Sequence, residues 1–179
     1  GSDPDAAIYW LARLIDGGEE PSFIARRLII SASEDIGLAN PNAMLIAMAC
    51  AEALDRIGWP EGRIPLAEAT IYLATSEKSN SAYLAIDSAL EYVRQSGNLP
   101  VPLHLRNAPT RLMADLDYGK GYKYSHDFPE HFVSQQYLPD KAANTSFWTP
   151  QMHTVHEVKL GERMKRWWKR EKSQKDTAE

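Results

Sequence analysis

Helix start and stop signals divide the first 97 residues at short, regular intervals. The spacing of these signals is the sequence feature that most limits the possible folds of the chain. Asp3-Pro4 and Asn40-Pro41 each place a capping side chain before a proline, which suits the first turn of a helix. Glycines end the apolar stretches as stop signals, at positions 17, 18, 37, 58 and 97. The pattern predicts five helices, over about residues 4–16, 21–36, 41–57, 63–75 and 79–96.

The apolar residues in these segments follow a helical period. Ile64, Ala67 and Ile71 are spaced three and four apart, and Ile86, Leu90 and Val93 repeat the pattern further on. Residues 6–15 are apolar nearly all round, which indicates a helix buried on more than one side. No run alternates with a period of two, as strands do. We therefore expect an all-α fold, with five helices joined by short loops in a bundle.

The organisation changes after Gly97. Pro100, Pro102 and Pro109 disfavour helix just before themselves, so residues 99–105 should be extended, and a short helix can follow over 108–116. Residues 117–151 mix glycine, proline and aromatic residues without a helical period, which indicates an ordered arm packed on this subunit or another. The tail from about residue 155 is predicted to be a helix. Because Gly161 lowers its helix propensity, we expect the helix to pack on a docking partner. The expected domains are a helical bundle (1–97), an aromatic-rich extension on the bundle or a neighbour (98–152), and a basic C-terminal helix with a frayed tail (153–179).

Composition limits the compartment and the partners. Apolar residues make up 44% and charged residues 25%, as in folded globular proteins. The net charge of −4 gives no overall attraction to nucleic acid, so any such contact must be a local patch. A single cysteine forms no intrachain disulfide, and no apolar run reaches the length of a membrane span. We expect a soluble cytoplasmic protein without membrane contact, and the start at Gly1 favours a piece of a longer chain.

The sequence contains none of the glycine-rich motifs that bind nucleotide phosphates. The nearest stretch is Gly119-Lys120-Gly121, where backbone N–H groups, Lys120 and Lys123 could meet a phosphate. A tight turn with packed tyrosines and solvated lysines explains the same residues, and we favour that interpretation.

Histidines and the cysteine offer no convincing reactive centre. His126 and His131 bracket Pro129, which prevents a helix from presenting both rings on one face to a metal ion. Cys50 lies in an apolar helix and is interpreted as a small core residue. We expect no catalytic residue, no metal site and no cofactor in this chain.

The segment 163–170 is basic and aromatic, with two adjacent tryptophans. Its basic residues are Arg163, Lys165, Arg166, Lys169 and Arg170. Such a run can bind phosphates while its aromatic rings stack on bases. The alternative, which we favour, is an amphipathic helix whose tryptophans dock on protein while the charges stay in water.

Several segments together resemble one family, the replication-associated recombination protein A family (RarA or MgsA), which includes the eukaryotic Werner helicase-interacting ATPase. They are residues 2–13, 24–28, 33–39, 78–83, 101–110, 118–127 and 136–139. The resemblance extends from Ser2 to about Arg170. Asp117 departs from it, because the family commonly has glycine before the Tyr118-Gly119 pair.

The resemblance implies the C-terminal part of an AAA+ ATPase whose ATP- and Mg²⁺-binding core lies upstream. It implies a helical region like a clamp-loader collar followed by an oligomerisation domain, and assembly into homotetramers. It also implies a parent that acts at stalled replication forks, in recombination and DNA repair, near the nucleoid, on DNA ends and with single-stranded DNA-binding protein.

We therefore expect a non-catalytic tetramerisation module, with a DNA-contacting module as the alternative. The residues expected at the oligomer interface are Met44, Met48, Ile64, Ile71, Tyr83 and Ile86. The residues expected to contact phosphates in the alternative are Lys120, Lys123, Arg163, Lys165, Arg166, Lys169 and Arg170.

Overall fold

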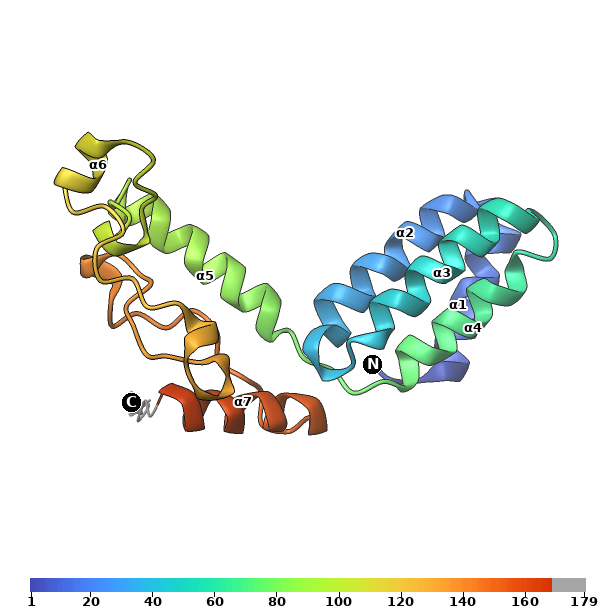
Figure 1. Ribbon diagram of the computed structural model, residues 1–179. Helices are drawn as coiled ribbons and strands as arrows, with labels where there is room; N and C mark the ends of the chain where they lie inside the picture. Colours follow the sequence, from blue (N-terminus) through green and yellow to red (C-terminus); the bar gives the residue numbers. More distant parts are fainter. Residues whose placement is uncertain (169–179) are drawn as a thin grey trace. The chain divides into compact units, whose positions relative to one another are not determined.

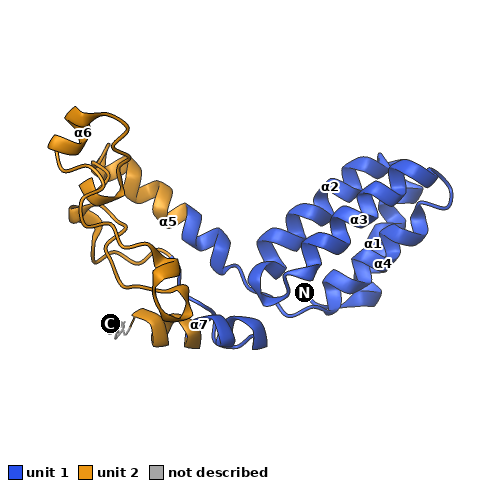
Figure 2. Cartoon of the chain, in the orientation of Figure 1, with its two compact units in different colours: residues 1–86, 148–161 blue, residues 87–147, 162–179 orange. Residues whose placement is uncertain are grey.

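The computed structural model describes residues 1–168, and every regular element in that range is a helix or a helical turn (Figure 1). This confirms the all-α prediction. The described chain forms two compact units, one of residues 1–86 with 148–161, the other of residues 87–147 with 162–168 (Figure 2). Within residues 1–168, no helix is both long and apolar enough to cross a membrane.

The first unit contains a four-helix bundle. Its helices are α1 (Pro4–Asp16), α2 (Pro21–Ser31), α3 (Asn42–Ile57) and α4 (Arg63–Thr75). The carboxylates of Asp3 and Glu20 cap α1 and α2 by accepting hydrogen bonds from Ala6 N and Phe23 N, each at 3.0 Å. Proline follows each of these caps at the first helical position, as predicted for Asp3-Pro4. The prediction for Asn40-Pro41 is wrong in detail, because α3 begins at Asn42 with Pro41 at the cap position, and Asn40 Oδ1 accepts from Asn42 N at 3.2 Å.

Small residues let the bundle helices approach closely. Helix α3 packs against both α2 and α4, and α1 packs on α4. Ala43 and Ala47 of α3 are fully buried, next to Leu73 of α4 in one part of the core. The other part of the core surrounds Leu66 and Cys50, so Cys50 is the core residue that we expected.

The predicted helix over 21–36 changes its winding before it ends. After α2, residues Ala32–Ile36 form a π-helical turn, and Gly37–Ala39 a 3₁₀ turn. Gly37 has φ of +48°, and a Cβ added to it would lie 2.6 Å from the Ser79 carbonyl oxygen. Ser79 N in turn donates to Asp35 O at 2.9 Å. The π turn therefore ends where the chain needs a glycine to accommodate the 76–80 loop.

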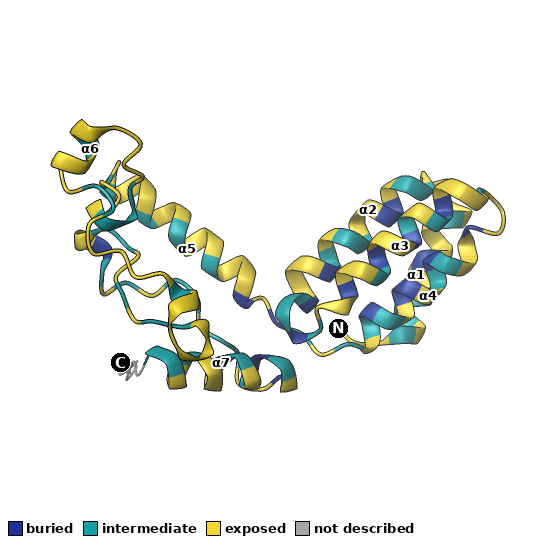
Figure 3. Ribbon diagram, in the orientation of Figure 1, coloured by how far each residue is buried: buried dark blue, intermediate teal, exposed yellow. Residues whose placement is uncertain are grey.

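Helix α5 (Ser81–Ser96) begins two residues later than predicted, and the boundary between the two units falls within it. Of its 16 residues, Ser81 is the one that is buried. The helix therefore leaves most of its surface in water (Figure 3).

Short turns organise the arm that follows α5. They are the 3₁₀ turns Leu103–Leu105, Ser125–Asp127, Pro129–His131 and Asp140–Ala142, and the one-turn helix α6 (Arg111–Asp115). The prediction of an extended segment over 99–105 is thus wrong for residues 103–105, which form a 3₁₀ turn. The helix predicted over 108–116 is present but shorter, at 111–115. The Arg106 side chain connects two parts of the arm, because its guanidinium donates to Val101 O at 2.8 Å and to the Tyr118 hydroxyl at 3.1 Å.

Helix α7 (Val155–Trp168) explains the glycine that sequence analysis found unfavourable. Gly161 is buried, and a Cβ there would lie 3.0 Å from Pro150 Cγ and 3.1 Å from Met152 Sδ. The close approach of residues 150–152 offsets the helix propensity that glycine lacks. The predicted frayed tail, residues 173–179, lies outside the described residues.

We predict that Gly37→Ala lowers the free energy of unfolding by about 2–4 kcal/mol, from backbone strain combined with the clash at Ser79 O. Gly18→Ala is the matched control, because Gly18 also has positive φ (+79°) but no atom within 4 Å of the added Cβ. The control should lose only about 1 kcal/mol. Urea unfolding followed by circular dichroism measures both. Equal losses in the two variants would contradict the packing argument.

Candidate functional site

Helix α5 has three sides with different surroundings. Ser81 and Tyr92 lie on a side that the rest of the chain covers. The Trp148 indole donates to Ser81 Oγ at 3.2 Å, and the Tyr92 hydroxyl donates to Lys141 O at 3.1 Å. The Tyr92 ring also meets the Phe147 ring edge-on, with centroids 5.5 Å apart. This side of α5 already has its packing partners.

A second side of α5 is apolar and exposed. Tyr83, Ile86, Leu90 and Val93 are each between 43% and 57% exposed. Their spacing of three, four and three residues is that of the apolar seam in paired helices. The third side is mixed, with charged residues such as Glu91 and one exposed apolar residue, Leu84. An apolar seam facing water is the feature expected of a surface that another helix covers.

The residues predicted at the oligomer interface are all exposed. Each is between 44% and 60% exposed. Two lie on each of three helices: Met44 and Met48 on α3, Ile64 and Ile71 on α4, and Tyr83 and Ile86 on α5. Helices α3 and α4 pack against each other. Leu90 and Val93 were recognised in the sequence as part of a helical stripe but were not assigned to the interface. Whether these six residues form an interface stays a prediction.

The two lysines of the glycine-rich stretch differ in their surroundings. Lys120 Nζ lies 2.9 Å from Asp117 Oδ1, and this hydrogen bond with the adjacent carboxylate charge raises the pKa of the lysine. Asp117 adopts positive φ (+63°), the conformation that glycine would adopt more easily. Lys123 is held through its backbone, because Gln135 bonds both Lys123 N and Lys123 O. The stretch is a tyrosine-containing turn, and one of its two ammonium groups is paired.

The tryptophans of α7 dock on the arm. Phe132 stacks on Trp167 with centroids 5.2 Å apart and planes 8° from parallel, and it meets Trp168 edge-on. The Arg163 guanidinium lies 5.9 Å from the Trp167 ring centre. One face of Trp167 therefore already packs on an aromatic ring, and a nucleic-acid base could stack on that face only by displacing Phe132.

Glu130 binds the same helix through polar contacts. Its Oε2 accepts hydrogen bonds from Trp167 Nε1 and Arg166 Nη2, both at 3.0 Å. The bond from Trp167, together with the positive charge of Arg166, holds the pKa of the Glu130 carboxyl below its usual 4.5. Of the basic residues expected to meet phosphate, Arg166 is thus already paired with an acid. Lys165 is exposed, whereas Lys169 and Arg170 lie outside the described residues.

A buried polar cluster around one acidic residue, Glu157, was not predicted from the sequence. Glu157 is fully buried, and its carboxyl group accepts hydrogen bonds from Ser81 Oγ and, at 3.2 Å, from Gln151 N. Thr154 Oγ1 accepts from Glu157 N at 3.3 Å and so caps α7. Thr154 and Glu157 have the threonine–glutamate spacing of a capping box, which was the available signal. The cluster joins the start of α7 to the start of α5.

Metal-ligating groups and the single cysteine have surroundings that the structure describes. No three His, Cys, Asp or Glu side chains in that part of the chain are grouped to hold a metal ion. Burial raises the pKa of the Cys50 thiol to about 11, so the thiolate that a nucleophile requires is disfavoured at neutral pH.

The Glu130 contacts predict a pH dependence. Because the folded-state pKa of Glu130 is lowered, its stabilising contribution is present above the unfolded pKa near 4.5 and is lost as pH falls through the folded value. Glu130→Gln should therefore lower the melting temperature at pH 7, and the difference from the unchanged chain should shrink at acidic pH. Glu162→Gln, the same change at an exposed position of α7, the helix that Glu130 contacts, is the control. A difference independent of pH would contradict the role of the carboxylate.

Comparison with known proteins places this architecture in a family. Residues 1–168 match the family described as MgsA AAA+ ATPase, C terminal. The chain is 44% identical over 178 residues to replication-associated recombination protein A of Coxiella burnetii, covering 99% of this chain and 40% of the relative. The corresponding protein of Bacillus subtilis is 46% identical over 160 residues, covering 89% and 38%. ATPase WRNIP1 of Dictyostelium discoideum is 42% identical over 148 residues, covering 82% and 17%.

These matches cover nearly all of this chain but at most 40% of each of these relatives. The matched family is the C-terminal part of MgsA AAA+ ATPases, and the all-helical architecture is consistent with such a domain. The chain belongs to the C-terminal domain family of the MgsA AAA+ ATPases.

Proposed function

We propose that this chain is a non-catalytic module that assembles its parent ATPase into a tetramer. The observation that carries the proposal is the exposed apolar seam of α5, formed by Tyr83, Ile86, Leu90 and Val93. Fully burying such a side chain contributes about 1.5–3 kcal/mol, and each of these is already about half buried, so each would add about 1 kcal/mol on assembly. A seam of four, repeated in each subunit, supports a stable closed assembly. Exposed Met44 and Met48 on α3 would extend the apolar surface of the first unit.

The biological setting of the proposal comes from the relatives. Two of them are named for replication-associated recombination. We propose that the parent uses an upstream ATP- and Mg²⁺-dependent core and acts at replication forks, on DNA ends and with single-stranded DNA-binding protein. The contribution of this chain would be to hold several ATPase cores together.

The experiment is the solution mass of the full chain by light scattering after size exclusion. We expect a mass near four times 20.1 kDa. Leu90→Glu places a charge within the apolar seam and should weaken assembly by about 2–4 kcal/mol per interface, or roughly 30- to 1,000-fold in the association constant. The mass should then fall at low protein concentration.

Gln95→Glu is the matched control, because it adds the same charge on α5 but away from the apolar seam. It should keep the tetramer mass. Circular dichroism shows whether both variants retain their helices. A folded Leu90→Glu variant with unchanged mass would remove α5 from the interface, and a monomeric unchanged chain would contradict the proposal itself.

A second candidate function is DNA contact through phosphates. The observation that favours it is that Lys123 and Lys165 are exposed. Lys120 and Arg166 are less available to a phosphate, because each is paired with an acid. Non-specific binding of this kind falls steeply with salt and varies little with sequence. A tetramer would strengthen weak contacts through avidity.

Fluorescence anisotropy of a labelled single strand across about 50–200 mM salt tests this candidate. The double variant Lys123→Ala with Lys165→Ala should reduce the log–log salt slope by about two. Lys141→Ala, on the arm, is the control and should leave the slope unchanged. Absence of binding by the unchanged chain at the lowest salt would exclude the DNA-contact role.

A further inference from the structure

The apolar seam of α5 has the same spacing when it is followed from either end. Tyr83, Ile86, Leu90 and Val93 lie three, four and three residues apart on one continuous helix, and all four are exposed. A contact between two identical copies about a two-fold axis requires a self-complementary surface of this kind. Two antiparallel copies of α5 that place Ile86 opposite Leu90 also place Tyr83 opposite Val93. Every apolar residue of the seam then meets an apolar residue.

One acid and one base lie along a single edge of this seam. Asp87 follows Ile86 and Arg94 follows Val93, so the two charges share a flank of the helix, seven residues apart. Both side chains are exposed, and neither forms a salt bridge with any residue in 1–168. They are too far apart to pair within one helix, where charges interact three or four residues apart. The flank therefore has both charges available for a partner.

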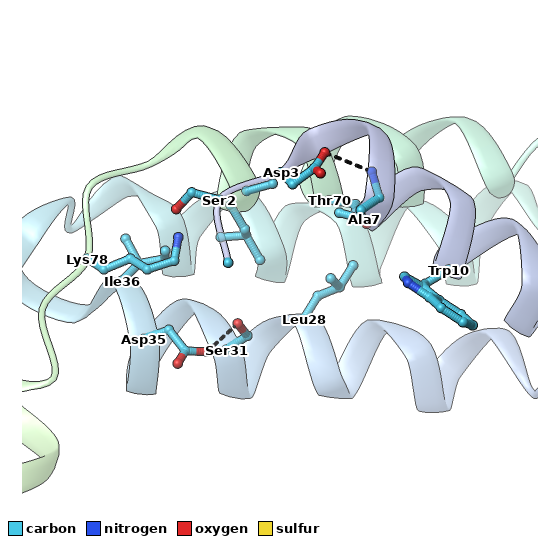
Figure 4. Close-up of a pocket in the computed structure, with 14 residues that line it drawn as sticks. Ser2, Asp3, Ala7, Trp10, Leu28, Ser31, Asp35, Ile36, Thr70 and Lys78 are labelled. Atoms are coloured by element: carbon cyan, nitrogen blue, oxygen red, sulfur yellow. Dashed lines mark hydrogen bonds between the residues drawn. The ribbon is translucent and has the colours of Figure 1, made fainter.

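Other acids of the chain have donors close by. At the cavity of about 420 Å³ between α1, α2 and α4, Asp3 accepts a hydrogen bond from Ala6 N at 3.0 Å (Figure 4). On α5 itself, Glu91 accepts from Gln95 Nε2 at 3.0 Å. Asp87 has no such donor among the described residues. Asp87 is therefore an acid of α5 that a base from another molecule could neutralise.

The direction of side chains on a helix decides which charges meet across the two-fold axis. The Cα–Cβ bonds of a helix tilt toward its N-terminus, so the side chains of two antiparallel helices lean in opposite directions. With Ile86 opposite Leu90, Asp87 and Arg94 of the partner subunit lean toward each other, whereas the two copies of Asp87 lean apart. The register that joins the apolar seams therefore also joins the charges in reciprocal ion pairs.

A parallel pairing of two α5 helices would leave these charges unused. In parallel pairs, the flank that carries Asp87 and Arg94 faces the opposite flank of the partner helix. That flank carries Ala82 and Ala89, which have no charge to offer. Charge complementarity thus favours the antiparallel arrangement.

We infer that α5 pairs antiparallel with α5 of a second copy of this chain about a two-fold axis. Ile86 packs against Leu90 at the centre of this contact, and Asp87 pairs with Arg94 of the partner subunit in both directions. The inference rests on the proposed tetramerisation, and it adds the orientation, the register and the charged residues of the contact. Because a two-fold contact joins only two copies, a tetramer built on it needs a second contact elsewhere on the chain.

Charge reversal at the two positions tests the register. Asp87→Arg opposes arginine to arginine at each ion pair, and Arg94→Asp opposes aspartate to aspartate, so each should lower the association constant roughly 5- to 50-fold. The double variant, Asp87→Arg with Arg94→Asp, exchanges the charges and should return the association constant to within about 3-fold of that of the unchanged chain. Light scattering of the full chain over a series of protein concentrations measures assembly, and circular dichroism confirms that each variant is folded.

Mixing the two single variants repeats the test between different chains. The Asp87→Arg chain and the Arg94→Asp chain each repel a copy of themselves at the ion pairs, but they match each other. At a concentration where each variant alone has a reduced mass, an equimolar mixture should recover the mass of the unchanged chain. Glu91→Arg is the control, because it makes the same charge reversal one turn further along α5 but away from the seam, and it should keep the mass.

The outcomes separate this inference from the proposed tetramer. Suppose that the unchanged chain assembles and that Leu90→Glu weakens the assembly, but that the double variant assembles no better than the single variants. The proposed function would then be supported and the antiparallel register overturned. Single variants that assemble like the unchanged chain, a mixture that stays at reduced mass, or an equal loss in Glu91→Arg would also overturn the register. A monomeric unchanged chain would overturn both proposals.

Discussion

Segment 148–161 belongs to the first unit, and the buried carboxyl group of Glu157 makes the hydrogen bonds that hold it there. A carboxyl group removed from water must be hydrogen-bonded, and here Ser81 and Gln151 supply the donors. Neighbouring bonds reinforce the contact, since His156 Nδ1 donates to Leu38 O at 2.7 Å and His153 Nε2 pairs with Lys78 O at 3.0 Å. Segment 148–161 is therefore held by the same loop that leads into α5.

The same contacts decide which side of α5 is available. Ser81 is bonded to both Glu157 and Trp148, and Tyr92 further along is bonded to the arm. Packing on this side leaves the apolar seam of α5 exposed. On α7, in contrast, Trp167 and Trp168 are already packed on Phe132. The proposed assembly uses the exposed apolar seam of α5, whereas Trp167 and Trp168 of α7 already have a ring partner in Phe132.

The sequence predicted most of the helices because their signals are local. Caps such as Asp3 and stops such as Gly58 act within one turn, and apolar spacing selects the buried face. It failed where a distant contact decides the backbone, as at residues 32–36, whose winding meets Ser79, and at residues 103–105. The six apolar residues predicted at the oligomer interface are exposed, and their place in an interface stays a prediction. The capping box of Thr154 and Glu157 was present in the sequence and was missed.

The amino-acid sequence by itself determined an all-helical chain of this family, with Cys50 in the core and a tail whose tryptophans need a partner. Caps, helical periods and family motifs are properties of short segments, so they can be read without a fold. Only the tertiary structure decided that Glu157 is buried, that Trp167 stacks on Phe132, and that the buried Thr70 hydroxyl lacks a hydrogen-bond partner among the described residues. Each of these depends on residues more than thirty positions apart or on space between helices, which no local pattern records.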